Sequence, residues 1–565
     1  MESLPLSIVG RIASCLESNA DRVLLTIVCK RFFDHRESYL RLNADALPGT
    51  YAYRQHGTML GSYRGIIDQH IVNAKMYTVR VHSTYTRFQP PDCFYFFADL
   101  DTDHSVDSIN KLFQAVLAIP NIAKVQFAES KKHPFSRDCW DRMKPMLQEL
   151  ADRSVPLEYE RLVRPEPLPD IPLTTMRILA VPHKVWWRLA PNMLPATLTW
   201  LSISSMALEG TLDQGVLPAG LKMLSMFYSE EDDANLNINL GSLLPPHLET
   251  LCIGSSINQS IPWSPLPSSI KTLEFGSQFG RQLDGTCLPQ SLTKLTMDGL
   301  PPFPINFPPS LTELKLDRLY LYSSDQTHPS QWLQCDPTMS PFSHLLELNI
   351  KRYLHHLELM WITSATFPKL QRLCMAGAVD YSGEAQVARL DLSSLPSTLR
   401  NLTIHVDRPT TFGLHGIEDL TLECAFKDAF NLVDSPLPLS LTTFFLNRYM
   451  HPVLDQQIPL SVTSLGIYNI KHRIECNTLP AGLRSLGLAQ ITPDCQMKPL
   501  PGIRCRLDQL AQSIMWLTLG TRGGKLGRCA KLVRISKTLF FAQGDDLTNC
   551  GFIDISTIMR LSNHF

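Results

Sequence analysis

Three short groups of side chains have residue types that could do chemistry. Asp99, Asp101 and Asp103 alternate after an apolar run, as the ligands of a calcium loop or an aspartyl nucleophile would. An EF-hand loop beginning at Asp99 would need glycine where His104 stands and glutamate where Asn110 stands. These carboxylates are therefore better explained as caps of a helix that follows them.

The other two groups are a glycine-rich segment and a histidine pair. The segment GTRGGK at 520–525 lacks P-loop spacing, and Leu526 stands where that loop has serine or threonine. His355 and His356 have no carboxylate at zinc-ligand spacing. No G-x-S-x-G element occurs, and no serine or cysteine has a base beside it. We expect no catalytic residue, no metal and no cofactor; an enzyme site hidden within residues 46–190 is the alternative.

The elements that position any functional residue follow from a repeated segment, L-P-x-x-L-x-x-L-x-apolar. Copies begin at Leu194, Leu217, Leu244, Leu266, Leu288, Phe307, Leu395, Leu414, Leu437, Ile458 and Leu479. A period of roughly 20–29 residues with this pattern is typical of leucine-rich repeats, in which each coil contributes one short strand and packs against its neighbours. The sequence therefore predicts a repeat array, a solenoid.

Alternation along each strand predicts one core and one exposed sheet face. Leu251 and Ile253 share the inward face, whereas Thr250, Cys252 and Gly254 face outward. We expect equivalent leucines to be buried in one column: Leu251, Leu295, Leu314, Leu402 and Leu486. Prolines in the connections disfavour helices there. Asn237 and Asn258 are expected at coil corners, where their amides bond backbone groups.

The repeat resembles the FNIP repeat, a leucine-rich-repeat variant written L-P-x-S-L-T-x-L-x-L and followed by an F-N-x-P-I-like element. LPQSLTKL at 288–295, FPPSLTEL at 307–314 and LPLSLTTF at 437–444 match the first half, and INQSI at 257–261 matches the second. The resemblance covers about residues 190–490. It implies an α/β repeat fold, a leucine-rich-repeat-like solenoid of parallel strands with few helices.

The N-terminal 45 residues have helical periodicity instead. Ile8, Ile12 and Leu16 are spaced four apart on one helix face, and a second helix capped by Asn19 or Asp21 is expected. This second helix should carry Leu24, Leu25, Val28 and Phe32. Such a small helical domain is expected to bury apolar side chains against a partner.

This segment is similar to an F-box, L-P-x-x-[IL]-x-x-x-[IL]-x-x-x-L followed by V-C-[KR]-x-[FW]. The matching residues are Leu4, Pro5, Ile8, Ile12, Leu16, Val28, Cys29, Lys30 and Phe32. The resemblance covers residues 2–45 and implies that these residues bind a Skp-type adaptor, which connects to a cullin ubiquitin ligase. The alternative is a helical cap that shields the first coil.

Two further segments complete the domain organisation. Residues 46–190 are predicted to form an α/β linker domain or degenerate repeats, with strands at 77–81, 94–98 and 123–127 and helices at 106–119 and 140–150. Residues 491–565 are predicted to cap the array, with strands at 516–519, 533–535 and 539–541. The predicted domains are 1–45, 46–190, 191–490 and 491–565.

Composition limits the partners. The 52 basic and 53 acidic residues nearly cancel, so no bulk attraction for nucleic acid or an anionic membrane is expected. The 14 cysteines form no C-x-x-C pair, and those in the repeats are expected to be reduced. The sequence contains no apolar run of about 18 residues, so it predicts no membrane span. We therefore expect a cytoplasmic or nuclear protein.

These observations favour a substrate-recognition subunit of a cullin-type SCF ubiquitin ligase, which would not itself be an enzyme. The N-terminal box would bind the adaptor and the repeats would bind an unidentified target protein. An FNIP-repeat interaction scaffold without a ligase role is the alternative. Large outward residues near the end of the array predict the target site: His405, Phe445, Asn447 and Tyr468. Trp200, Met223 and Phe227, near its beginning, are expected to be covered by flanking residues.

Overall fold

A computed structural model shows the fold of the chain. It describes residues 4–16, 19–41, 63, 66, 77–82, 93–97, 114, 116–119, 122–128, 135, 137–161, 171–178, 190–204, 215–227, 244–254, 266–276, 288–297, 307–316, 342–350, 354–355, 362–375, 379–380, 389–413, 416–424, 430–468, 472, 474–475, 478–489, 503–504, 513–520, 529–537, 539–543 and 551–554. The chain divides into two compact units. Unit 1 contains residues 1–77, 89–93 and 420–565, and unit 2 contains residues 78–88 and 94–419.

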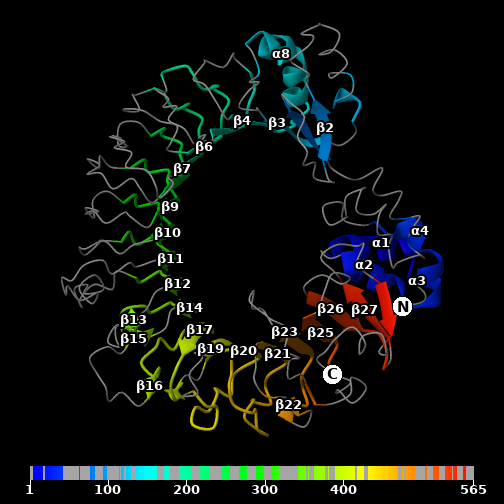
Figure 1. Ribbon diagram of the computed structural model, residues 1–565, viewed down its shortest axis with the longest axis vertical. Coiled ribbons are helices and arrows are strands. Elements are labelled where there is room, and N and C mark those ends of the chain that lie inside the picture. Colours follow the sequence, from blue (N-terminus) through cyan, green and yellow to red (C-terminus); the bar gives the residue numbers. More distant parts are fainter. Residues whose placement is uncertain are drawn as a thin grey trace. The chain divides into compact units, whose positions relative to one another are not determined.

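Most of the described chain is parallel sheet with few helices, as a repeat solenoid requires, and consecutive strands of each unit lie side by side (Figure 1). The main strands of unit 2 are β1 (Tyr77–His82), β2 (Cys93–Phe97), β3 (Ile122–Ala128), β4 (Leu157–Arg161), β5 (Thr175–Ile178), β6 (Trp200–Ser204), β7 (Met223–Phe227), β8 (Thr250–Ile253), β9 (Thr272–Phe275), β10 (Lys294–Met297), β11 (Glu313–Leu316), β12 (Glu347–Ile350), β14 (Arg372–Met375) and β17 (Asn401–Val406). Each strand from β3 to β12 pairs in parallel with the next, and β12, β14 and β17 continue the series. The β5–β6 pairing therefore carries the sheet across the predicted boundary at residue 190 without a break.

Unit 1 continues the same kind of coil and then changes strand direction. Its main strands are β20 (Thr443–Asn447), β21 (Ser464–Tyr468), β23 (Ser485–Ala489), β25 (Trp516–Gly520), β26 (Cys529–Arg534), β27 (Leu539–Gln543) and β28 (Gly551–Asp554), and β19 (Asp419–Cys424) stands at the division between the units. Strands β20, β21, β23 and β25 pair in parallel, whereas β25 to β28 are antiparallel. The predicted C-terminal strands thus extend the sheet of unit 1.

In the part of the chain that the structure describes, three pairs of two-residue strands lie outside these sheets. They are β13 (Leu354–His355) with β15 (Val379–Asp380), β16 (Leu390–Asp391) with β18 (Thr410–Thr411), and β22 (Ile474–Glu475) with β24 (Ile503–Arg504). Each pair is parallel and joins neighbouring coils. Their shortness leaves the main sheets to carry most of the backbone pairing between coils.

The predicted leucine column is present in unit 2. Leu251, Leu295, Leu314 and Leu402 belong to one continuous set of register partners, with Leu273, Leu348 and Leu373 between them. Every member of this set is at most 2% exposed. Leu486 occupies the matching column of unit 1, between Leu465 and Leu517. The L-x-L spacing therefore predicted the inward face correctly.

The Leu-Pro pair of each repeat begins a turn that leads into the strand. The Leu248 N–H donates to the Pro245 carbonyl at 3.1 Å, and the Leu292 N–H donates to the Pro289 carbonyl at 3.1 Å. The serine of L-P-x-S-L then bonds to the preceding coil, because Ser269 Oγ donates to the Leu248 carbonyl at 2.6 Å. Ser291 Oγ donates to the Ile270 carbonyl at 2.7 Å in the same way. These serine hydroxyls therefore form a series of hydrogen bonds between consecutive coils, which is called the serine ladder below. Asn237 and Asn258, which were expected at coil corners, lie outside the described residues.

The serine ladder leads to a matched pair of variants in one turn. Ser269→Ala is expected to destabilise its coil by about 0.5–1.5 kcal/mol, because the Leu248 carbonyl loses its hydroxyl donor. The neighbouring Ser268 is exposed, so Ser268→Ala should change stability by less than about 0.5 kcal/mol. Chemical denaturation of both variants measures the difference. Equal losses would show that the hydrogen bond between Ser269 and the Leu248 carbonyl contributes nothing.

Within residues 4–41, the structure describes four short helices: α1 (Leu6–Cys15), α2 (Asn19–Thr26), α3 (Lys30–Asp34) and α4 (Arg36–Tyr39). The predicted second helix was wrong beyond Thr26, because Cys29 is extended at φ −151° and ψ 159°. Phe32 therefore belongs to a separate helix, α3, and Leu16 lies just after α1. The extended residue redirects the chain and turns Phe32 inward.

One longer helix, α8 (Arg137–Asp152), packs on strands β3 and β4 of unit 2. The Trp140 ring lies 5.3 Å from Phe127 and 5.0 Å from Tyr159, measured between centroids. The helix includes the predicted 140–150, and the strands predicted near 77, 94 and 123 are confirmed as β1, β2 and β3. One sheet face here is apolar under α8, and the other carries Gln126 and Glu158.

Candidate interaction surfaces

The N-terminal helices present apolar side chains that the rest of unit 1 covers only in part. Ile8 is 43% exposed, Ile12 is 41% exposed and Val28 is 52% exposed. On the neighbouring positions of α1, Val9 and Ala13 are each 1% exposed. Helix α1 thus has two apolar stripes, of which folding of the described chain uses only one. The three exposed residues are called the N-terminal apolar face below.

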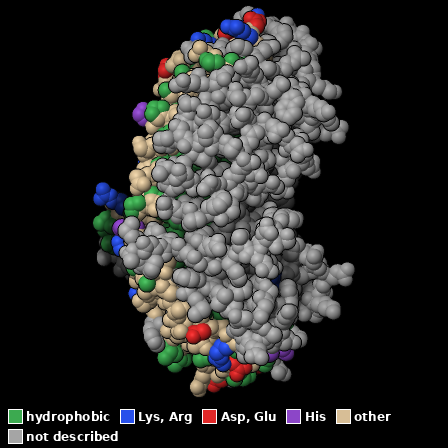
Figure 2. All heavy atoms as spheres, turned by 90° about the vertical axis from the view of Figure 1, so that its left-hand side faces the viewer, with side chains coloured by type: hydrophobic (Ala, Val, Ile, Leu, Met, Phe, Trp, Pro, Cys, Tyr) green, Lys and Arg blue, Asp and Glu red, His purple; other side chains and the backbone are tan. Residues whose placement is uncertain are grey.

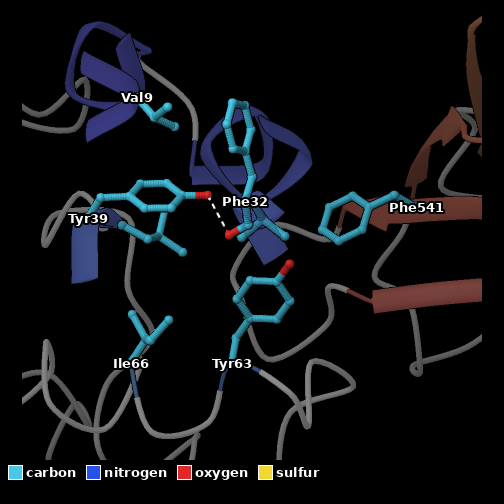
Figure 3. Close-up of a cluster of buried hydrophobic side chains, with 8 residues drawn as sticks. Val9, Phe32, Tyr39, Tyr63, Ile66 and Phe541 are labelled. Atoms are coloured by element: carbon cyan, nitrogen blue, oxygen red, sulfur yellow. Dashed lines mark hydrogen bonds between the residues drawn. The ribbon is translucent and has the colours of Figure 1, made fainter. Parts of the chain in front are cut away.

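Val9 of the buried stripe belongs to a core that joins the two ends of the chain (Figure 3). Val9, Val23, Phe32, Tyr39, Leu40, Tyr63, Ile66 and Phe541 form this cluster. Tyr39 and Phe32 are linked by a 2.9 Å hydrogen bond from the tyrosine hydroxyl to the Phe32 carbonyl. Phe541 comes from strand β27, so the C-terminal sheet completes the core of the N-terminal helices. Figure 1 shows these helices beside β26 and β27.

The predicted adaptor-binding residues therefore divide into two groups. Ile8, Ile12, Val28 and Pro5 are exposed. Leu4, Leu16 and Cys29 are half-buried, and Leu4 and Cys29 pack against the core cluster. Phe32 is 1% exposed, so the structure corrects its predicted place: it supports the helices from inside and is not on their surface.

Two arginines that sequence reasoning did not select hold the N-terminal apolar face in position. Arg31 of α3 donates from Nη1 to the Leu4 carbonyl at 2.9 Å, across the start of α1. Arg22 of α2 donates from Nε to the Leu16 carbonyl at 2.8 Å, at the end of α1. Both ends of α1 are thereby tied to neighbouring helices. Neither arginine has a sequence signal, because its acceptor is a backbone carbonyl.

The predicted target-binding residues are half-buried, not fully exposed as expected. Phe445 and Tyr468 stack with centroids 6.2 Å apart and planes 7° from parallel. Asn447 is the register partner of Tyr468, so the structure brings these three residues of unit 1 together. His405 lies on β17, which belongs to unit 2 and not to unit 1.

The outward face of unit 2 has a different, charged character. Lys294 and Lys315 both pair with Glu313, at 3.1 Å and 3.0 Å. Partial burial would raise the pKa of Glu313, but hydrogen bonds from Lys315 and Lys294 outweigh it and lower that pKa. Arg372 pairs with Glu347 at 2.7 Å. These opposite charges therefore pair with one another within the sheet. On the side of the molecule drawn in Figure 2, the coloured charged side chains occur in small separate groups.

Small outward residues are less exposed than the alternation predicted. Cys252 is only 8% exposed, because the Glu274 side chain of the next strand lies over it, with Sγ 3.6 Å from Oε2. Trp200 is half-buried, and the Arg177 guanidinium lies 4.9 Å from its ring centroid. Arg177 belongs to the flanking segment 46–190, so the expected covering of Trp200 by that segment is confirmed. The side chain of Phe227 lies outside the described residues.

A polar pocket of about 140 Å³ lies on the sheet of unit 2, at β1, β3, β4 and β5. Arg80, Arg177, Glu158 and Glu160 line it, so its formal charges balance. Arg80 Nε donates to Gln126 Oε1 at 2.7 Å, and Glu158 accepts from Lys124 at 3.0 Å. Its side chains thus bond largely to one another. The pocket has room for one small polar group.

Cys252 and Cys424 are poor nucleophiles. Burial, followed by the charge of Glu274, raises the pKa of Cys252 to about 12, and burial raises the pKa of Cys424 to about 12. A thiolate is the reactive form of cysteine, so these thiols stay protonated near neutral pH. The described ranges contain no group of three or more His, Cys, Asp or Glu that could hold a metal ion. Asp99, Asp101 and Asp103 lie outside them.

Comparison with known proteins supports the assignment of the repeat but gives no support to the F-box similarity of the N-terminal helices. A model of the FNIP repeat matches residues 258–299. No curated protein matches the chain. FNIP repeats suggest a repeat-based role in protein interaction. The similarity of residues 2–45 to an F-box stays a prediction. Within the described part of the chain, no helix is both long and apolar enough to cross a membrane.

Proposed function

We propose that this chain is a substrate-recognition subunit of a cullin-type SCF ubiquitin ligase. Its N-terminal helices hold a Skp-type adaptor, and its repeat sheet holds a target protein. The observation that carries the proposal is the N-terminal apolar face, where Ile8, Ile12 and Val28 are 43%, 41% and 52% exposed. These residues occupy the positions at which an F-box contacts its adaptor.

Large apolar side chains left exposed to solvent need a reason, because they contribute little to folding. Full burial of an isoleucine or valine side chain contributes roughly 1.5–3 kcal/mol before association costs are subtracted. The three residues are about half covered already, so each has only part of that gain left for a partner. In the proposal they supply the apolar part of a protein interface, and Arg11 and Lys30, which are exposed and close to them in sequence, supply polar groups.

In this proposal the chain is not an enzyme by itself. It acts by proximity: holding the target on one surface and the adaptor on another raises the effective concentration of a target lysine near a bound ubiquitin carrier. The repeat sheet supports this role because its coils present a long row of outward side chains from many consecutive strands. The target binds through the repeats, independently of the N-terminal apolar face.

The test is a charge placed in the apolar face. Ile8→Asp/Ile12→Asp is expected to abolish adaptor binding, because two carboxylates would have to be desolvated at the interface. Purified chain and Skp-type adaptor are mixed, and binding is measured by calorimetry. Ser7→Asp/Ser14→Asp adds the same charge at two exposed positions of the same helix and should bind as wild type does.

Wild-type affinity in the isoleucine double variant, with intact helical circular dichroism, would exclude this face as the adaptor site. Point variants are preferable to deleting residues 1–45, because the deletion also removes the helices that cover Phe541.

A second candidate function is an interaction scaffold with no ligase role. One observation favours it: Val9, Val23 and Phe32 share a core with Phe541, so the helices already have a structural task as a cap within unit 1. The contact seen is with Phe541 of the C-terminal sheet, within unit 1. In the scaffold alternative, wild-type chain fails to bind any Skp-type adaptor while its repeats still recover partners.

A further inference from the structure

The polar pocket on the sheet of unit 2 has an arginine on each of its two outer strands. Strand β1 pairs with β3, β3 with β4 and β4 with β5, so Arg80 of β1 and Arg177 of β5 line the pocket from opposite sides. Between them, Ala128 of β3 and Glu160 of β4 are register partners. Ala128 has only a methyl group and so leaves space above β3. The pocket of about 140 Å³ therefore lies between two positively charged side chains.

Hydrogen bonds within the pocket neutralise Glu158 but neither arginine. Glu158 accepts from Lys124 Nζ at 3.2 Å and 3.0 Å, and also from Gln126 Nε2. Gln126 Oε1 in turn accepts from Arg80 Nε at 2.7 Å, which orients that guanidinium. Among the described residues, the Nη1 and Nη2 groups of Arg80 have no acceptor, and neither Arg80 nor Arg177 forms an ion pair. Arg80 is thus held by one N–H group and retains the others for a ligand.

Arg177 is held by an aromatic ring instead of a carboxylate. Its guanidinium carbon lies 4.9 Å from the centroid of the Trp200 ring. Trp200 is on β6, whereas Glu160, the register partner of Arg177, is on the opposite neighbour, β4. The contact with Trp200 therefore draws Arg177 away from Glu160. A cation–π contact uses the face of the guanidinium and leaves N–H groups at its edge. Arg177 thus keeps its charge and its donors for a ligand.

The unpaired charges of the pocket leave one positive charge in excess. Lys124 and Glu158 cancel each other as an ion pair, and the charges that remain are those of Arg80, Arg177 and Glu160. A ligand with one negative charge would neutralise the site. A doubly charged phosphate would leave it negative, and a cation would add to the positive excess. Together with the small volume, this charge favours a single carboxylate.

We propose that this pocket binds the carboxylate of an aspartate or glutamate side chain of the target protein. The proposal rests on the proposed function in one respect only, that the repeat sheet is the surface for the target. The planar guanidinium of Arg80 matches the planar carboxylate and donates to it from its Nη groups, while Arg177 supplies the second positive charge. A segment that lies on the sheet presents side chains along its whole length but a terminal carboxylate only at its end. An acidic side chain is therefore the expected source.

The experiment uses the full chain and a blocked glutamate, N-acetylglutamate N-methylamide, whose binding is titrated by saturation-transfer NMR. Wild type should bind this probe and should not bind the blocked glutamine of the same size, which lacks the charge. Arg80→Gln should weaken binding by about tenfold or more, because hydrogen bonds to a charged group are lost. Ala128→Leu keeps every charge and should also weaken binding, because the larger side chain fills the pocket.

Two further variants separate this site from a general effect of charge. Glu160→Gln should strengthen binding of the blocked glutamate, by up to about fivefold, because it removes a like charge beside the ligand. Arg372→Gln/Arg400→Gln removes two positive charges from other coils of unit 2 and should leave binding unchanged. A role of the pocket in folding alone would not produce the gain in Glu160→Gln.

Four results would overturn the proposal. They are no binding of the blocked glutamate by wild type at millimolar concentration, equal binding by a correctly folded Arg80→Gln chain, tighter binding of blocked phosphoserine or blocked lysine, and tighter binding of N-acetylglycine, whose carboxylate is a chain end. Folding is checked by the thermal transition of each variant. Ile8→Asp/Ile12→Asp should bind the probe as wild type does. Loss of adaptor binding with retained probe binding therefore refutes only the ligase role, and the reverse refutes only this inference.

Discussion

Phe541→Ala is expected to destabilise the N-terminal helices by about 3–5 kcal/mol, although more than 500 positions of sequence separate this residue from α1. The Phe541 side chain is 0% exposed and belongs to the same cluster as Val9, Phe32 and Tyr63. Its removal leaves a cavity that neighbouring side chains fill only partly. Hydrogen exchange should show faster exchange of the α3 amides as well as those of β27.

Ile535→Ala is the matched control, because Ile535 follows β26 but is 38% exposed and does not belong to the cluster. It should change exchange near its own position and leave α3 protected. If Phe541→Ala accelerates exchange only within residues 529–554, the helices and the C-terminal strands are energetically independent. A coupled response would also make adaptor affinity decrease in Phe541→Ala, because the N-terminal apolar face depends on the core beneath it.

Leu295→Ala is expected to destabilise the middle of unit 2 by about 2–5 kcal/mol. Leu295 is 0% exposed between Leu273 and Leu314 in the leucine column. Coils in a repeat array interact mainly with their neighbours, so the loss should be greatest in β9, β10 and β11. Hydrogen exchange resolved by peptide measures this local loss better than a single unfolding transition does.

The control for Leu295 is the same substitution at a leucine in a turn. Leu439 is 83% exposed, so Leu439→Ala should change stability by less than about 0.5 kcal/mol. Uniform loss of protection along the whole of unit 2 in Leu295→Ala would contradict nearest-neighbour coupling. Similar effects of the two leucine variants would contradict the assignment of Leu295 to the core.

The repeat itself was predictable because its physical causes are local. Leucines two residues apart must share a strand face, and proline disfavours helix in the connections between strands, so Leu251, Leu295 and Leu314 could be assigned to one column from spacing alone. Helix α1 and its exposed stripe were predictable for the same reason, since Ile8 and Ile12 are one helical turn apart. The end of α2 was not, because the extended Cys29 has no distinctive sequence signal.

What only the tertiary structure decided is which distant residues share an environment. Spacing within one segment cannot show that Phe541 completes the core around Phe32, that Ser269 bonds to Leu248, or that Glu274 covers Cys252. Likewise, Gly466 is an ordinary small residue in the sequence. Only its register beside Phe445 shows that the Phe445 ring lies over it. The sequence by itself determined the period, the strand faces and the candidate surfaces, because these depend on neighbours along the chain. The burial of each side chain and the contacts that hold it in place depend on other coils and on the chain ends, which only folding brings together.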